Sequence, residues 1–236
     1  HIMGAILLKW LKQKQIEMVE TEGGLIDFNK NDNYYIDLNN LTGSSTYDAE
    51  NKLKSFLIEA SDDNKQLTPK AFNSWCRRNY TRVNDWLKDL ETESRDIFVD
   101  KGYIIESTEN YTKNKTRKVF KFTTKLQDEF IKLKGLKQFL EDMSAIDEKK
   151  AIEVHLWDEY LIFAESFGIA DKVAKQFKDF HPVEYENNYN YYHSYLWIST
   201  FSYSATTAAT SASSGGSFSG GGTSSGGFSS GGGGVR

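Results

Sequence analysis

The chain has 236 residues, a formal net charge of −4 and 39% hydrophobic residues, enough for one large or two small domains with a real core. With this modest negative net charge, the chain as a whole is not expected to attract nucleic acid or an anionic membrane electrostatically. The single cysteine, Cys76, excludes an intramolecular disulfide framework and fits a reducing compartment. The sequence contains no secretory signal and no apolar run of the ~18 residues that a membrane span needs.

The first forty residues predict a partial winged-helix-like unit. Residues 1–3 resemble the remnant of a cleaved tag, and we expect the chain to be a piece of a longer protein. Between Ala5 and Gln15 the apolar residues share one helical face. Residues 16–20 and 34–38 alternate as strands do, around Gly- and Asn-rich turns. Residues 4–40 are therefore expected to form a helix followed by a β-ribbon.

Residues 41–123 predict a complete winged-helix-like domain. A first helical stripe ends at residue 60, and Thr68-Pro69 marks a helix start, with an N-cap residue and a proline at the first helical position. A short helix and a long helix follow, and the long one stops at Lys101-Gly102. Two strand-like segments then flank a polar loop from Glu109 to Lys118. Helix, short helix, long helix and β-hairpin is the order of elements in a winged-helix module.

The remaining residues predict a helical block and a tail. Amphipathic stripes run through residues 124–183, and Pro182 ends the regular structure. Residues 184–236 are aromatic and then rich in Ser and Gly, with no charged residue from 187 to 235 and eleven glycines in 215–234. This composition predicts a disordered tail, so that truncation after Tyr203 should not change the melting temperature. The predicted fold class is mainly α (α+β), with winged-helix-like units, β-hairpin wings, a helical block and a disordered Gly-rich tail.

The order of these segments resembles one bacterial family. Lys134-Gly-Leu-Lys-Gln-Phe-Leu-Glu-Asp, the segment from Leu156 through Gly168-Ile-Ala-Asp-Lys-Val, and the Gly-rich tail are similar to the C-terminal part of the YciQ-like predicted membrane proteins, domain of unknown function family 2207. The resemblance implies an extracytoplasmic domain, a membrane anchor and cytoplasmic winged-helix-like segments. It therefore implies that this chain lies on the cytoplasmic side of the bacterial inner membrane.

The resemblance has two departures and one limit. The family's N-terminal domain and membrane anchor are absent, which favours a piece of a longer protein. A transmembrane hairpin common in the family would fall between Ser107 and Phe130 and is absent, either because this member lacks it or because it was removed. The family brings no established activity and no catalytic residues.

The polar loop of the predicted hairpin holds a cluster of basic residues. They are candidate contacts for phosphate or anionic lipid, and a merely solvated loop is the alternative. The cluster comprises Lys113, Lys115, Arg117, Lys118 and Lys121. A DNA-binding role would use the long helix, which begins near Arg77, Arg78 and Arg82. Its later carboxylates, from Asp85 to Asp96, would repel phosphates and disfavour that role.

The uncharged aromatic segment is the second candidate contact surface. Its candidate partner contacts are Tyr189, Tyr191, Tyr192, Tyr195 and Trp197. Three alternatives remain open: the segment extends the last helix and packs on its own body, it binds a partner or a second copy, or it lies at a membrane interface.

No catalytic or metal-binding pattern is found. His155, Asp158 and Glu159 share one helical face, but the second histidine that a metal site usually needs is missing. Arg77 and Arg78 beside Cys76 could lower the thiol pKa, whereas the neighbouring aromatic residues suggest burial. Glycines follow no phosphate-loop or dinucleotide pattern. We therefore predict no cofactor, no metal site and no catalytic residue.

The leading functional hypothesis is a non-enzymatic cytoplasmic scaffold or interaction region of a bacterial membrane protein. The partner would be an unknown protein, a second copy or an anionic membrane surface, and no small-molecule substrate is identified. A winged-helix nucleic-acid-binding regulator is the first alternative, and an enzyme of unrecognised type is the second.

Overall fold

A computed structural model describes residues 1–21, 33–112, 115–142, 157–180 and 189–214. Helices dominate these residues, and two small antiparallel sheets accompany them, which confirms the predicted mainly helical α+β class. The elements are α1 (Ile2–Lys12), β1 (Glu17–Glu20), β2 (Tyr34–Asp37), α2 (Asp48–Ala60), β3 (Gln66–Leu67), α3 (Pro69–Arg78), α4 (Tyr80–Asp100), β4 (Ile104–Thr112), β5 (Lys115–Phe122), α5 (Thr124–Asp142), α6 (Trp157–Phe167), α7 (Ala170–Phe180) and α9 (Tyr189–Ser214).

Local signals set several helix ends. The Thr68 side chain accepts a hydrogen bond from the amide of Ala71, and Pro69 opens α3, as the sequence predicts. Gly102 follows α4 with φ of 69°, and Gly168 follows α6 with φ of 70°. Residues with a Cβ rarely adopt this left-handed conformation, so glycine ends both helices.

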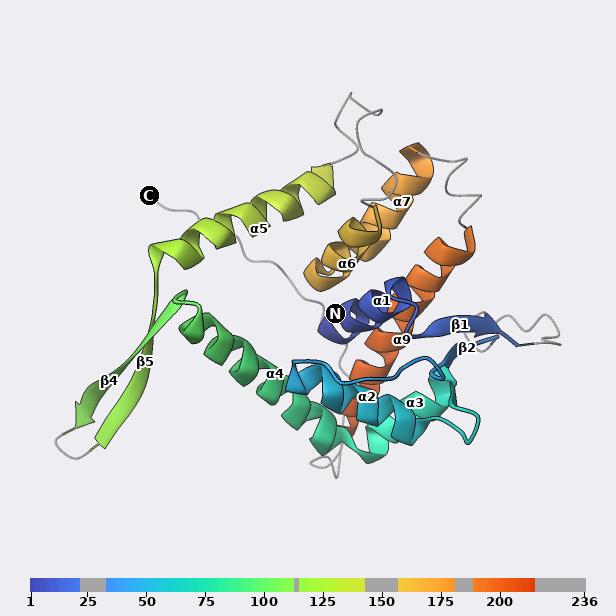
Figure 1. The fold of residues 1–236 in the computed structure, drawn as a ribbon, viewed down its shortest axis with the longest axis horizontal. Helices are drawn as coiled ribbons and strands as arrows, with labels where there is room; N and C mark the ends of the chain where they lie inside the picture. The colour runs from blue at the N-terminus through green and yellow to red at the C-terminus, as the bar shows by residue number, and fades with distance from the viewer. Residues whose placement is uncertain (22–32, 113–114, 143–156, 181–188, 215–236) are drawn as a thin grey trace, which may run out of the picture.

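The two sheets do not follow the winged-helix expectation. The first sheet has the order β1-β2-β3, in which Ile36 of β2 pairs with Leu67 of β3. The β4–β5 hairpin forms a separate two-stranded sheet at the far end of α4 (Figure 1). Strand β3, which belongs to the predicted 41–123 domain, thus pairs with β2 of the preceding segment and not with the β4–β5 hairpin of its own segment. The winged-helix identity of this segment is therefore not confirmed. The domain boundaries stay a prediction.

Two further expectations about flexible segments were wrong. Most of the expected polar loop, Glu109 to Lys118, belongs to the ladder, because β4 runs to Thr112 and β5 begins at Lys115. Residues 189–214, expected to belong to a disordered tail, form the long helix α9. The Gly-rich residues 215–236 lie outside the described residues.

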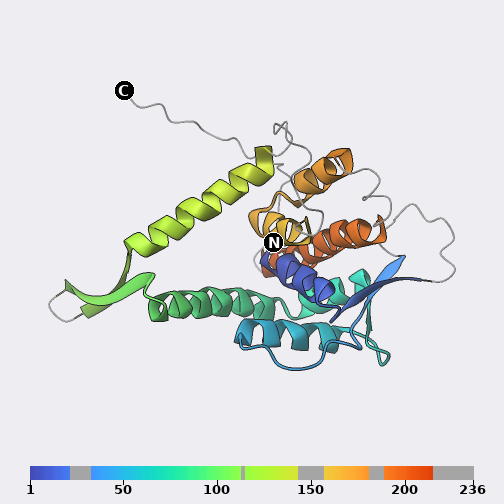
Figure 2. The same cartoon turned by 45° about the horizontal axis from the view of Figure 1, so that its top comes forward.

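Helix α9 lies at the centre of the molecule. It contacts α1, α3, α4 and α7, and Figures 1 and 2 show it running among these helices. Its buried residues include Tyr195, Trp197, Ile198 and Phe201, followed by alanines. They join side chains from α1, α2, α3, α6 and α7 in one buried hydrophobic cluster. No helix within the described parts of the chain is long and apolar enough to span a membrane.

Candidate functional site

The most exposed apolar surface lies on a projecting arm. We define the arm as residues 88–135: the second half of α4, the β4–β5 hairpin and the first half of α5. In Figures 1 and 2 the two helices diverge from the hairpin, and their far ends join the body. Among the arm's described side chains only Ile104 is buried. The arm's large exposed apolar side chains are Phe98, Ile105, Phe122, Phe130, Ile131 and Leu133.

A hydrogen-bonded clamp holds the base of the hairpin. The amide of Thr123 donates to the carbonyl of Tyr103, at 3.1 Å. The Thr123 hydroxyl lies 2.9 Å from the same carbonyl and 3.1 Å from that of Gly102. The Lys125 ammonium lies 4.4 Å from the centre of the Tyr103 ring and 2.9 Å from the carbonyl of Lys101. These contacts join the end of α4 to the start of α5 and thereby set the direction of both helices.

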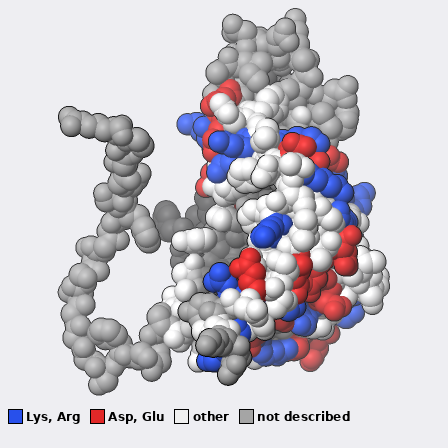
Figure 3. Space-filling view, turned by 90° about the vertical axis from the view of Figure 1, so that its left-hand side faces the viewer, with Lys and Arg blue, Asp and Glu red and all other residues white. Residues whose placement is uncertain are grey.

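The predicted basic cluster lies along one strand of the hairpin and is partly neutralised. Lys118 forms an ion pair with Glu106 at 2.6 Å, and Arg117 lies 3.6 Å from Glu109. Lys115 and Lys121 are exposed, and Lys113 lies outside the described residues. The structure therefore brings carboxylates of β4 beside cations of β5, which the linear pattern did not reveal. Seen from the hairpin side, acidic and basic residues are intermingled around uncharged surface (Figure 3).

The expected aromatic contact surface is largely internal where it is described. Tyr195 is buried and its hydroxyl donates to the carbonyl of Leu161 at 2.6 Å. Trp197 is buried and stacks on Phe201, with ring centres 5.3 Å apart. Of the three alternatives, packing on the molecule's own body is therefore the one observed for these two residues. The side chains of Tyr189, Tyr191 and Tyr192 lie outside the described residues.

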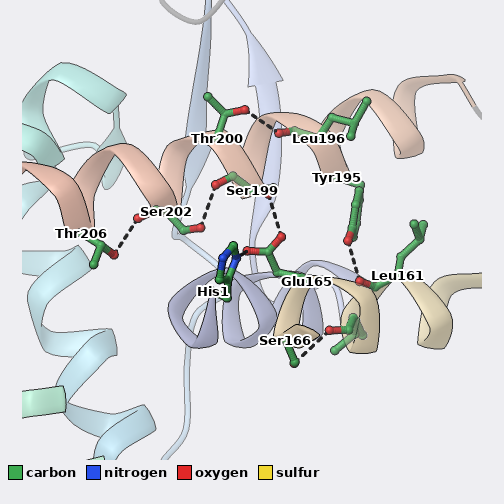
Figure 4. A network of polar contacts seen from close by, with 11 residues as sticks. His1, Leu161, Glu165, Ser166, Tyr195, Leu196, Ser199, Thr200, Ser202 and Thr206 are labelled. Atoms are coloured by element: carbon green, nitrogen blue, oxygen red, sulfur yellow. Dashed lines mark hydrogen bonds and ion pairs between the residues drawn. The ribbon is translucent and has the colours of Figure 1, made fainter. Parts of the chain in front are cut away.

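A buried carboxyl group, which the sequence analysis did not single out, lies where α1, α6 and α9 meet (Figure 4). The Glu165 side chain is 1% exposed, and the Ser199 hydroxyl donates to it at 2.7 Å. The His1 ring nitrogen Nδ1 lies 3.4 Å from its other oxygen. Burial raises the pKa of Glu165, and the hydrogen bond from Ser199 opposes that rise. A polar residue at a buried position of the amphipathic α6 pattern was the one signal in the sequence.

Gly4 permits this close approach of helices. A Cβ at position 4 would lie 2.5 Å from Glu165 Oε1 and 2.7 Å from Ser202 Oγ. A cavity of about 270 Å³ beside the cluster is lined by His1, Glu165, Ser199 and the start of α7. The cluster thus joins three helices through a glycine, two serines and one carboxyl group. Its Ser199 hydroxyl and Glu165 carboxyl group are hydrogen-bonded to each other and buried between the helices.

The structure also bears on the cysteine and on the residues considered as metal ligands. Burial raises the pKa of the Cys76 thiol to about 12, the opposite of the lowering that its arginine neighbours suggested. In the described part of the chain no group of three or more His, Cys, Asp or Glu residues could hold a metal ion. His155 lies outside the described residues, as does the side chain of Asp158, whereas Glu159 forms an ion pair with Lys12.

Arg82, in the first turn of the long helix α4, is engaged within the molecule. Arg82 forms two hydrogen bonds to Glu59, at 2.6 and 2.8 Å. Its guanidinium also lies 5.0 Å from the centre of the Phe56 ring and 5.1 Å from that of Trp75. If Arg82 bound a phosphate, it would first have to give up these contacts, and their loss would weaken the binding.

Fold and site together define a mainly helical protein with a projecting, partly apolar arm and a buried polar cluster. Residues 115–177, from β5 into α7, match the family model described as predicted membrane protein (DUF2207) C-terminal domain. This match confirms, over these residues, the resemblance found in the sequence, and it is consistent with membership of the DUF2207 family, whose function is unknown. No curated protein and no solved structure matches the chain.

Proposed function

We propose that this chain is a non-enzymatic interaction region of a DUF2207 membrane protein and that it makes its contact through the arm. The region would act on the cytoplasmic side of the bacterial inner membrane. The single, unpaired cysteine fits the reducing compartment that this location provides.

The exposure of the arm carries the proposal. Phe122 is 68% exposed, Phe130 64% and Ile131 66%, although each belongs to an ordered strand or helix. A two-stranded hairpin is marginally stable by itself in water, and contiguous exposed apolar surface commonly marks an interaction site. The clamp at Thr123 holds this surface away from the body, where a partner can reach it.

The charge on the arm favours a protein surface as the partner. The second half of α4 bears Glu91, Asp96 and Asp100, whereas β5 and the start of α5 bear mainly lysine and arginine. Such mixed charge complements another mixed surface. Anionic lipid or a nucleic-acid backbone would be repelled by the carboxylates. The engagement of Arg82 with Glu59 further weakens the nucleic-acid alternative.

Site-specific photo-crosslinking in the full-length protein, in its native membrane, tests the proposal. A photoreactive phenylalanine analogue replaces Phe122 or Phe130 in the arm. Matched control positions are Ile58 and Tyr80, apolar residues of the body that are 40% and 37% exposed. We expect discrete adducts from the arm positions and none from the controls. Equal adducts from both sets, or none from the arm, would contradict the proposal.

A further inference from the structure

Resting on the proposed function, we propose that the partner of the arm is a second copy of this chain, and that two arms pack against each other in a symmetric dimer. Three observations favour a second copy as the partner. The apolar stripe of α5 is covered along only half its length, and the arm is long enough for an interface. The two limbs of the arm, which are α4 on one side and β5 with the first half of α5 on the other, carry opposite charge.

The apolar stripe of α5 continues beyond its established interface. At the end nearest the body, Leu140 is buried and Phe139 packs edge-on against Tyr160 of α6, with ring centres 6.0 Å apart. The same helix carries Phe130 and Leu133 farther along, and both are exposed. Helix α5 is thus covered by α6 and α7 over one half only. A helical surface of this kind is covered most simply by another helix that brings its own apolar stripe.

The two limbs of the arm carry opposite charge. Residues 115–134 contain seven lysine and arginine residues against two carboxylates, Asp128 and Glu129. Lys121 and Lys134 are exposed and form no ion pair among the described residues. On α4, Glu91 and Asp100 are exposed and likewise form no ion pair with any described residue.

A two-fold axis makes these opposite charges complementary. In a contact of this symmetry the same surface patch of each copy is used, so that residue i meets residue j and j meets i. The basic limb of one copy can then lie on the acidic limb of the other, twice. The ion pairs would be at the edge of the contact and the exposed phenylalanines and isoleucines at its centre, the usual anatomy of a protein interface.

The arm is large enough for such a contact. A stable interface buries about 800 Å² from each partner, in about 20–30 residues. The first half of α5, residues 124–135, is about 18 Å long at 1.5 Å per residue. The hairpin adjoins the start of this half of α5, and α4 leads away from the hairpin on the opposite limb of the arm (Figure 1). Residues 88–135 therefore offer more residues than such an interface uses, and their exposed apolar side chains suit its centre.

Sedimentation velocity of the full chain across micromolar concentrations tests the inference. We expect a concentration-dependent monomer–dimer equilibrium for the wild type. Phe130→Ser/Ile131→Ser should weaken dimerisation at least about tenfold, because it removes the centre of the contact. The matched control, Tyr47→Ser/Ile58→Ser, changes apolar residues of the body that are 43% and 40% exposed and should dimerise as the wild type does.

A charge exchange makes the test specific. Lys121→Glu/Lys134→Glu and Glu91→Lys/Asp100→Lys should each be largely monomeric alone, since like charges then meet at both edges. An equimolar mixture of the two variants should form a heterodimer, because both contacts are again between opposite charges. Circular dichroism and a thermal melt establish that each variant is folded. Failure of the mixture to associate, while both variants are folded, would overturn the inference.

The remaining outcomes separate this inference from the proposed function. A wild type that stays monomeric, while the arm positions crosslink to another protein or to lipid, would overturn the second-copy inference and leave the arm as a contact surface. A dimer that survives the Phe130→Ser/Ile131→Ser substitutions would place the interface elsewhere and overturn the inference. A monomer whose arm yields no crosslink would contradict both.

Discussion

Replacing Phe201 by alanine should strongly destabilise the protein. The Phe201 side chain is 3% exposed, and its ring lies 5.2 Å from that of Phe72 and 5.3 Å from that of Trp197, measured between ring centres. Removing a buried phenylalanine costs about 3–5 kcal/mol, and the loss of two ring contacts favours the upper half of that range. We therefore expect the free energy of unfolding to fall by about 4 kcal/mol, which lowers the melting temperature by about 8–16 °C.

Tyr203 provides a matched control two residues farther along the same helix. Its side chain is 65% exposed, so Tyr203→Ala should change the free energy of unfolding by no more than about 0.5 kcal/mol. Urea unfolding followed by circular dichroism and by tryptophan fluorescence measures both variants. Equal unfolding midpoints for the two variants would show that α9 does not pack in the core, and would restore the disordered-tail interpretation.

Three further predictions concern the polar cluster and the cysteine. Gly4→Ala should lower the free energy of unfolding by about 1–3 kcal/mol, because the new Cβ would meet Glu165 and Ser202. Gly135→Ala, at a position of α5 with open space around it, should raise the free energy of unfolding by about 0.5–1 kcal/mol. Urea midpoints that shift in the same direction for both variants would contradict this prediction. Because burial raises the folded-state pKa of Glu165, its contribution to stability is present at acid pH and is lost as the pH rises through that pKa. The urea midpoint of Glu165→Gln should therefore gain on that of the wild type as the pH rises above 4.5, the ordinary pKa of a glutamate, and a constant difference would argue against the raised pKa. Cys76 is fully buried and the pKa of its thiol is raised to about 12, so a thiol-reactive disulfide reagent should modify it only after unfolding, and fast modification of the native protein would show that the site is open.

Elements whose limits depend on neighbouring residues could be predicted from the sequence. The start of α3 at Thr68-Pro69 and the ends of α4 and α6 before Gly102 and Gly168 are all local effects of side-chain capping or of glycine conformation. Strand β3, Gln66–Leu67, could not be predicted, because two residues carry no periodicity and their pairing partner lies about thirty residues earlier.

Helix α9 shows how composition can conceal a pattern. Low charge and many small residues indicated a tail, yet Tyr195, Ile198, Ser202, Ala205 and Ala209 are spaced by three and four residues and are all buried. Serine and alanine cover little area in this stripe and give a weak apolar signal. Their small size is nevertheless what allows α1 and α6 to approach closely, at Gly4 and Ser199.

For the candidate sites, too, some features could be predicted from the sequence and others depend on the tertiary structure. The sequence by itself determined the mainly helical class, the hairpin with its basic strand and the resemblance of its C-terminal part to the DUF2207 family, because these depend on local periodicity and on residue order. Only the tertiary structure decided which surfaces are available: it placed Tyr195 and Trp197 in the core, set Glu106 against Lys118, and left Phe130 in water. Burial and ion pairing depend on residues far apart in the chain, and a linear pattern does not record which of them meet.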